Sequence, residues 1–280
     1  MISRVGGVYG LYGPDSVAWK TNRETALLFG GPRALLLQLA HPLVAAGVRE
    51  HSDYEKDPYG RLQRTLHYTL SIVFGTEEEA REAAADVNAR HLKVRGRLGR
   101  KTGRFPAKAA YDARDPELLM WVQATLLDTS SMLYERWIGP LTGTERERHY
   151  RESKILAGML GLPAPAMPKD WKAFQAYFRR MVEGHELAVD DATRKMVHTI
   201  LHPPGIPRLA AEAQATLTAG LLPERVREMY GLPWGPVQEA VLRMADESIR
   251  FMVPRMPPAV RYFPQYRRAV RRVGLSGRKR

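Results

Sequence analysis

DPELLMWVQATLLDTSSMLYERW, from Asp115 to Trp137, is the stretch of this sequence that decides the fold. Asp115 before Pro116 is a helix-start signal, and neither glycine nor a further proline interrupts the residues up to Trp137. Apolar side chains occur on almost every side of the predicted helix, which is typical of a helix at the centre of a fold. The polar residues of this helix then need partners inside the protein, and they are Gln123, Asp128, Thr129, Ser130 and Ser131.

Helix signals recur on both sides of this stretch, whereas strand patterns are nearly absent. Pro32 stands at a first helical position before a segment rich in Leu and Ala, 33–46, and a second helix is predicted over 60–74. Thr144 with Glu147 has the pattern of a capping box, which predicts a helix start there. Further helix starts are expected at Asp170, Pro207, Pro223, Pro233 and Pro258. The sequence therefore predicts an all-α fold.

A single domain is expected over residues 1–280, because no low-complexity linker divides the chain and no repeat of 20–50 residues occurs in it. The 20 prolines fall mainly between the predicted helices. The longest expected non-helical connection outside the termini is 101–114. The basic tail, 273–280, is expected to be mobile.

Composition limits the kinds of site that the chain can form. The chain contains no cysteine, which excludes disulfides, iron–sulfur clusters, thiolate-ligated haem and covalent haem attachment. The leading ligand for a transition metal or haem iron is therefore one of the eight histidines. No run approaches the roughly 18 apolar residues that a membrane span needs, and the N-terminus lacks a secretory pattern. We expect a cytoplasmic protein without a transmembrane segment.

The net charge of +13 permits contact with nucleic acid or anionic lipid, or merely keeps the protein in solution. Much of the excess lies in the last residues, 267–280, where a solvated basic tail is the simplest interpretation. No motif of a nucleic-acid-binding protein accompanies the charge, so no specific nucleic-acid partner is expected. A basic helical interaction protein without a cofactor remains one alternative.

The third predicted helix carries a histidine in an apolar row. Thr76 and Glu79 form a capping-box pattern that opens this helix, which is expected to run to about Leu98. Its row follows spacings of four, three, four, three and four, and its members are Ala80, Ala84, Val87, His91, Val94 and Leu98. A neutral imidazole midway along such a row suits an axial iron ligand, but a core histidine bonded to a backbone carbonyl has the same pattern. His41 is a rival ligand, although the proline after it favours a structural role.

The second predicted helix has a polar face opposite its apolar one. Arg61, Arg64, Thr65 and Tyr68 lie within about a third of its circumference. These side chains could donate hydrogen bonds to an oxygen species or bind haem propionates. A solvated helix face has the same pattern, so both interpretations stay open.

Several motifs occur in an order that resembles one known family, the fungal MpaB oxygenases with the bacterial latex-clearing rubber oxygenases. The resemblance is close over 33–137 and looser to about Arg268. The motifs are Arg33-Ala-Leu-Leu-Leu-Gln-Leu-Ala-His41-Pro42, Gly47-Val48 with His51-Ser52, Asp57-Pro58, Arg61-Leu62-x-Arg64-Thr65, Phe74-Gly75-Thr76, Asn88-x-x-His91 with Val94-x-Gly96, Tyr111-x-Ala113-x-Asp115-Pro116 and Trp121-Val122-x-Ala124-Thr125-Leu126.

The resemblance implies a globin-like helical core, with additional C-terminal helices, around a non-covalent b-type haem. It implies that His91 is the proximal iron ligand, and that Arg61, Arg64 and Thr65 are catalytic residues on the opposite face. Further cofactor contacts are expected from Arg61, Thr65, Tyr68, Val87, Val94, Trp121 and Val122. The implied reaction is the oxidation of a hydrophobic substrate, isoprenoid or otherwise unsaturated, by dioxygen.

Two departures from the family matter for this expectation. Arg64 stands where the rubber oxygenases have a lysine that can ligate iron, and arginine does not lose its proton to do so. Gln123 stands where many relatives have histidine. The acidic base proposed for the rubber enzymes falls near Glu50 without a secure alignment. A haem-binding or peroxide-handling protein without oxygenase turnover remains a second alternative.

Overall fold

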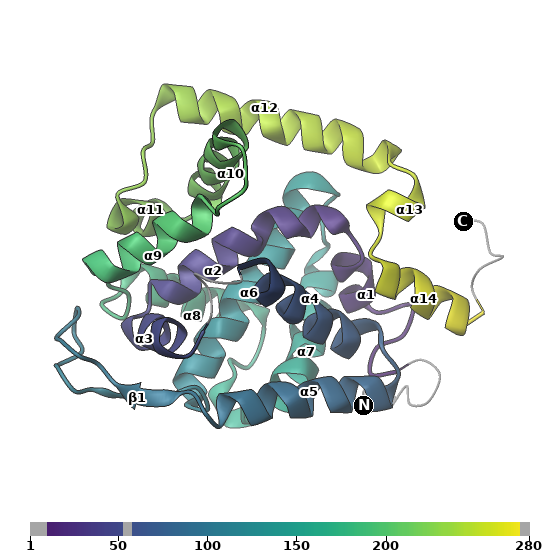
Figure 1. Cartoon of the computed structure of the whole chain (residues 1–280). Coiled ribbons are helices and arrows are strands. Elements are labelled where there is room, and N and C mark those ends of the chain that lie inside the picture. Colours follow the sequence, from purple (N-terminus) through teal and green to yellow (C-terminus); the bar gives the residue numbers. More distant parts are fainter. Residues whose placement is uncertain (1–9, 53–57, 275–280) are drawn as a thin grey trace.

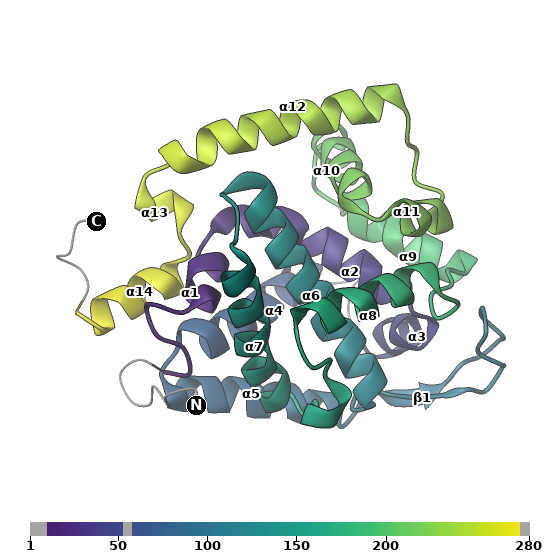
Figure 2. The ribbon, with the colours of Figure 1, turned by 180° about the vertical axis from the view of Figure 1, so that it is seen from behind.

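Helices make up most of the part of the chain that the computed structural model describes, residues 10–52 and 58–274. Figure 1 shows α12 across the top of the molecule, α5 along the bottom and α6 between them, and Figure 2 shows α6 from behind with α7 and α8 beside it. The helices up to the middle of the chain are α1 (Val17–Asn22), the 3-10 helix η2 (Thr25–Gly30), α2 (Gly31–Leu39), α3 (Pro42–His51), α4 (Pro58–Phe74), α5 (Glu77–His91) and α6 (Pro116–Trp137).

The second half of the chain is helical as well. Its elements are α7 (Gly143–Met159), η3 (Ala164–Ala166), α8 (Trp171–Glu183), α9 (Asp191–Leu201), α10 (Arg208–Leu221), α11 (Glu224–Tyr230), α12 (Pro236–Met252), η4 (Val253–Arg255), α13 (Pro258–Arg261) and α14 (Pro264–Arg272). The mostly helical fold that the sequence predicts is confirmed. The globin-like arrangement of the core and the single-domain boundary stay predictions.

The central helix α6 begins and ends where the sequence predicts. The Asp115 side chain accepts a hydrogen bond from the Glu117 backbone N–H and so caps the first turn. Trp121 and Ala124 are fully buried in the largest apolar cluster, together with residues of α2, α8 and α9. The Thr125 hydroxyl accepts a hydrogen bond from the Gln38 side chain at 3.1 Å. Burial on most sides thus makes α6 the helix around which the fold is built.

Two further polar residues of α6 find their partners on α2. Arg33 donates from one guanidinium nitrogen to the Thr129 hydroxyl at 2.5 Å and from another to the Asp128 carboxylate at 2.7 Å. The Nε of Arg33 donates to the Leu221 backbone oxygen at 2.7 Å. These bonds compensate the burial of the guanidinium and fix α2 against α6.

A sharp bend separates the two helices before and after His41-Pro42. Thr25–Leu39 and Pro42–His51 are bent by 110° relative to each other, so the predicted helical segment 33–46 is divided at Pro42. Within the described ranges no single helix is long and apolar enough to cross a membrane, although this bent pair passes a test of length and composition. Much of the pair is buried in the core of the protein.

The third predicted helix is shorter than its apolar row suggested. The capping box of Thr76 and Glu79 is present, but α5 ends at His91 instead of near Leu98. After a turn, Arg95–Arg97 (β1) pairs antiparallel with Ala110–Asp112 (β2), with Gly96 opposite Tyr111. Val94 and Leu98 therefore contact the core from a hairpin, and the expectation of a helix through 92–98 is wrong.

Three other boundaries differ from the predicted ones. The capping box that opens α7 uses Thr142 and Glu145, so the prediction of Thr144 with Glu147 is wrong. The helix expected at Pro233 begins at Pro236 instead. The helix α9 was not predicted, although Asp190 caps it by accepting a bond from the Thr193 backbone N–H.

Three sequence predictions fall outside what the structure describes. The mobile tail, 273–280, lies beyond the last described residue apart from its first two positions, and the motif residue Asp57 lies between the two described ranges. The side chain of Arg61 is likewise outside the described part. The roles expected for them stay predictions.

Candidate functional site

The helices α4 and α5 form an antiparallel pair that carries most of the predicted site residues. Only Gly75 and Thr76 separate the two helices, so residues late in α5 lie beside residues early in α4. Tyr68 is half-buried in an apolar cluster with Ala83 and Ala84, and the Arg90 guanidinium lies 5.9 Å from the centre of its ring. This pairing brings the polar face of α4 close to the C-terminal end of α5.

His91 is the last residue of α5 and lies on the same face as the buried Ala80 and Ala84. Its side chain is half-buried, and burial lowers the pKa of its imidazole, an effect that the nearby Asp112 carboxylate opposes. The ring makes no hydrogen bond with any residue in the described part of the chain. A neutral imidazole with a free ring nitrogen can bind a metal ion, whereas a core histidine with both ring nitrogens bonded cannot.

Val87 and Val94 lie on either side of His91 along the chain, and Val122 lies on α6; all three side chains are half-buried. Val87 precedes His91 by about one turn, and the Val94 backbone N–H donates to the His91 backbone oxygen at 3.1 Å. Val122 lies one turn after Leu118, which packs in one apolar cluster with Val94. All three were predicted as cofactor contacts, and that role stays a prediction.

The predicted donors on α4 lie at its surface. Arg64 and Thr65 are exposed, and both make interactions within the protein. Because they share the helix face of Tyr68, they adjoin the end of α5 and are accessible to a ligand that binds there. Arginine and threonine both donate hydrogen bonds, so this surface suits an oxygen-rich or anionic group.

Trp121 is not brought to this group of residues. Its indole is fully buried, donates to the Leu37 backbone oxygen at 3.1 Å, and stacks on Phe178 with ring centres 5.7 Å apart. The side chain thus fixes α6 between α2 and α8. Its expected contact with a cofactor stays a prediction.

A polar cluster that the sequence did not identify lies where α3 meets β2. The buried Tyr111 hydroxyl donates a short hydrogen bond to the Glu50 carboxylate. The same hydroxyl lies 3.2 Å from Nε2 of His51. Burial, followed by the bond to Glu50, raises the pKa of Tyr111, so the phenol keeps its proton. One proton donor therefore joins a carboxylate and an imidazole at the end of α3.

Two glycines leave the space that the Tyr111 ring occupies. A Cβ atom at Gly96 would lie 2.6 Å from Cζ of Tyr111, and one at Gly47 would lie 3.7 Å from the ring. Both glycines and Tyr111 belong to the motifs in the sequence, but only the β1–β2 pairing places them together. In the sequence, the signal for this cluster would have been the presence of Gly47, Gly96 and Tyr111 in neighbouring motifs.

Two other histidines are buried in different surroundings. His149 lies between the Thr21 and Ser131 hydroxyls, at 3.2 and 3.3 Å, so both of its ring nitrogens have partners. His41 lies beside Phe105, 5.2 Å between ring centres, and its Nδ1 has no hydrogen-bond partner. Burial lowers the pKa of each to about 4. Neither lies on the helix pair that carries Arg64 and Thr65.

No group of three or more acidic or histidine side chains within the described ranges could hold a metal ion by itself. A porphyrin supplies four of the ligands of its iron, so a haem needs only one imidazole from the protein. The half-buried and unbonded ring of His91 fits that requirement.

Comparison with known proteins identifies the same family that the sequence motifs resemble. The family model described as "ER-bound oxygenase mpaB/B'/Rubber oxygenase, catalytic domain" matches residues 19–251. An uncharacterized protein of Mycobacterium tuberculosis and one of Mycobacterium bovis are each 29% identical to the chain over 230 residues, which is 77% of this chain and 87% of each relative. No solved structure matches the chain. The family match covers every residue of the candidate site.

Proposed function

The chain belongs to the family of the mpaB and rubber oxygenase catalytic domains, and from this premise we propose that it is a b-type haem-dependent oxygenase of hydrophobic, unsaturated substrates. The family implies oxygenase activity. The haem, its ligand and the substrate class are parts of the proposal. It includes an isoprenoid as one such substrate.

The observation that carries the proposal is the state of the His91 ring. Among the buried histidines His149 has both nitrogens engaged, and His41, whose Nδ1 is also without a partner, lies at the start of α3 and not on α4 or α5. His91 is half-buried, shifted toward its neutral form, and without a hydrogen bond to the described residues. In the proposal it binds the iron, and Val87 and Val94 exclude water around the bond.

The haem, when bound, supplies the one-electron chemistry with dioxygen that protein side chains lack. The chain contributes orientation and charge. Arg64 and Thr65, and Arg61 as expected, would donate hydrogen bonds from α4 to an oxygen-containing group bound there, and such donors stabilise negative charge that develops on oxygen by several kcal/mol in a dry site. Because an arginine side chain does not ligate iron, Arg64 would not serve as a second ligand of a haem held by His91.

Glu50 is the group proposed to accept a proton from the substrate. Its carboxylate is exposed, while the bond from Tyr111 holds one of its oxygens in place. Tyr111 does not lose its proton near neutral pH, so it orients Glu50 without competing for a substrate proton. His51 contacts the same hydroxyl through Nε2 and completes the hydrogen-bonded cluster.

An absorption spectrum of the purified protein tests the ligand. Expressed with adequate haem, the wild-type chain is expected to have a Soret band, and His91→Ala is expected to lose the band or shift it. His67→Ala removes an exposed histidine of the adjacent helix α4 and serves as the matched control. An unchanged spectrum in His91→Ala would reassign the ligand, with His51 and His41 next in order, and a colourless wild-type protein would refute the haem.

A second measurement separates the oxygenase from a haem protein without turnover. Dioxygen uptake is measured with and without an unsaturated hydrocarbon such as squalene, and the products are analysed for carbonyl groups. Substrate-dependent uptake with carbonyl products supports the oxygenase. Uptake that does not depend on any alkene, with the same spectrum, supports the alternative of peroxide handling or haem storage.

A further inference from the structure

A row of large apolar side chains lies on the outer surface of α12. Val237, Met244 and Phe251 are 71%, 58% and 61% exposed. They are spaced by seven residues, so each follows the previous one within about 20° around the helix. Single exposed apolar residues are common, but three in register on one helix are not explained by chance exposure.

The orientation of α12 is fixed by its opposite side. Leu242, Ala245 and Ile249 pack in an apolar cluster with α6 and α10. The Asp246 carboxylate accepts a hydrogen bond from the Trp137 indole at 2.7 Å and forms an ion pair with Arg136. The helix therefore cannot rotate to bury the outer row without breaking a buried ion pair.

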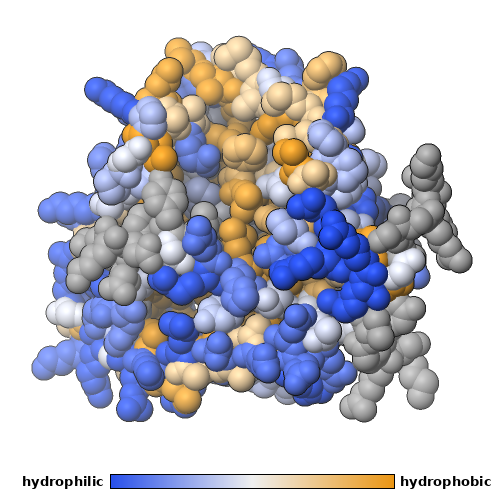
Figure 3. All heavy atoms as spheres, turned by 45° about the vertical axis from the view of Figure 1, so that its right-hand side comes forward, coloured by the Kyte–Doolittle hydropathy of each residue, from blue (hydrophilic) through white to orange (hydrophobic). Residues whose placement is uncertain are grey.

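The apolar surface continues beyond the end of α12. Met252 and Val260 are 52% and 55% exposed. Figure 3 shows the side on which α13 and α14 lie, where a band of hydrophobic side chains runs from the top of the molecule down its middle beside strongly hydrophilic residues. We call Val237, Met244, Phe251, Met252, Val260 and the adjoining Arg255 the α12 face.

The charge beside the C-terminal part of the α12 face is positive, although the exposed Glu247 lies on the face itself, three residues after Met244. After Glu247 the chain contains no Asp or Glu as far as its last residue, whereas arginines recur through α12, η4, α13 and α14. The Arg255 guanidinium lies over the exposed ring of Phe251 at 3.9 Å from its centre. An exposed ring with a cation above it matches a bilayer surface, where the ring enters the acyl boundary and the cation stays at the phosphates.

We propose that the α12 face docks the protein on an anionic lipid bilayer. The apolar row enters the interface, and Arg255 with the exposed Arg268 and Arg271 of α14 contacts the headgroups. Nucleic acid offers phosphates but no apolar phase for Met244, Phe251 and Met252, so lipid accounts for both properties of the surface. The docking needs no bound haem, so it stands or falls separately from the oxygenase.

Co-sedimentation with vesicles tests the docking. The wild-type chain is expected to bind vesicles with one-third phosphatidylglycerol, at least tenfold more strongly than vesicles of phosphatidylcholine alone, and to lose binding as salt rises. The double variant Met244→Asp/Phe251→Asp is expected to lose at least tenfold. Leu92→Asp changes an apolar residue that is 54% exposed near the β1–β2 hairpin, on the opposite side of the molecule from α12, and is expected to bind like the wild type.

Equal loss in Leu92→Asp and in the double variant would overturn the proposal, as would a wild-type chain that does not bind anionic vesicles. Light scattering without lipid tests the rival occupant, a second copy of this chain. A stable dimer that the double variant dissociates would assign the α12 face to self-association instead. Circular dichroism of both variants checks that they remain folded.

The absence of native cysteine permits a second and direct readout. Met252→Cys and Leu92→Cys each introduce one thiol, which is labelled with a dye whose emission depends on solvent polarity. Anionic vesicles are expected to shift the emission at position 252 to shorter wavelength and to leave that at position 92 unchanged. No shift at 252 would show that this surface does not enter lipid.

Discussion

His149 shows at the residue scale how a buried side chain makes stability depend on pH. Its ring lies between the Thr21 and Ser131 hydroxyls, and burial alone lowers its pKa to about 4. The unfolded chain binds a proton at this residue below about pH 6.5, whereas the folded chain does not until about pH 4. Stability is therefore fully present above pH 6.5 and is lost as the pH falls through this window.

We expect urea denaturation to show this loss directly. The free energy of unfolding should fall by about 1.4 kcal/mol per pH unit for each such histidine, and His149→Gln should remove one of these contributions. The pKa of His41 is lowered as well, so His41 still contributes in the variant. The unfolding free energy of His149→Gln should therefore keep a smaller slope against pH. Equal slopes in the wild type and His149→Gln between pH 6.5 and 4 would contradict the buried neutral state.

Tyr111→Phe tests whether the phenol positions Glu50. The variant keeps the ring but removes the donor to the carboxylate, so we expect stability to fall by about 1 kcal/mol and the Soret band to remain. Substrate oxidation should fall at least tenfold, with a changed pH profile, because Glu50 is no longer held. Tyr230→Phe removes another buried phenol, which bonds the Leu36 backbone oxygen at 2.6 Å, and should change stability alone. Equal turnover in both variants would limit Tyr111 to a structural role.

At the scale of the element, the β1–β2 hairpin depends on a glycine. A Cβ atom at Gly96 would meet Cζ of Tyr111 at 2.6 Å, whereas one at Gly99 would meet nothing within 4 Å. We expect Gly96→Ala to cost 1–3 kcal/mol, about the cost of overpacking, and Gly99→Ala to cost less than about 0.5 kcal/mol. Thermal and urea unfolding of the two variants measure the difference. Similar losses would mean that Tyr111 moves aside without cost.

Local patterns predicted some elements well and others poorly, for physical reasons. The bounds of α6 were predictable because a capping aspartate, a proline and a continuous apolar run all act within the helix itself. The end of α5 was not, because Val94 continues the apolar row from a hairpin that forms only through pairing with distant 110–112. For α9 the start signal was Asp190 alone, with no proline to mark it.

In the candidate site, too, local patterns predicted some features, and features that depend on distant contacts were missed. His91 was singled out by its spacing, and the pairing of α4 with α5 brings Tyr68 against Arg90, the residue before it, while the role of His91 as a ligand stays a prediction. The bond between Glu50 and Tyr111 joins residues that only the tertiary fold brings together, so no local period reports it. Long-range contacts of this kind explain why local patterns in the sequence did not predict the polar cluster.

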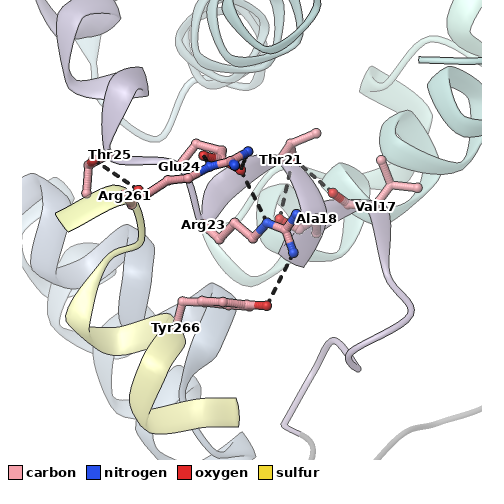
Figure 4. A network of polar contacts seen from close by, with 8 residues as sticks. All are labelled: Val17, Ala18, Thr21, Arg23, Glu24, Thr25, Arg261 and Tyr266. Carbon is pink, nitrogen blue, oxygen red and sulfur yellow. Dashed lines mark hydrogen bonds and ion pairs between the residues drawn. The ribbon is translucent and has the colours of Figure 1, made fainter. Parts of the chain in front are cut away.

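At the scale of the whole molecule, the C-terminal elements are tied back to the N-terminal ones. The Phe263 backbone N–H donates to the Arg23 backbone oxygen at 3.0 Å, and the Tyr266 hydroxyl accepts a bond from the Arg23 guanidinium at 3.3 Å. Figure 4 shows Arg23 and Arg261 converging on Glu24, a carboxylate that is fully buried. Because α12 lies between these anchors and α10, the α12 face is held in place at both ends.

Glu24→Gln tests how far this connection stabilises the fold. Arg261 donates to the two carboxylate oxygens at 2.8 and 3.0 Å, and Arg23 donates to one of them at 3.3 Å. Removing the negative charge leaves two guanidinium groups next to each other in a largely buried place, so we expect the free energy of unfolding to fall by about 3 kcal/mol.

Glu212→Gln serves as the control, because it breaks an exposed ion pair with Arg208, with 3.9 Å between the charged atoms, and should cost less than about 0.5 kcal/mol. Urea denaturation measures both variants, and limited proteolysis should cut the Glu24→Gln protein faster within 253–263. Equal losses would mean that the C-terminal segment is held by apolar packing against α1 and α4, and that the buried ion pair contributes no net stability.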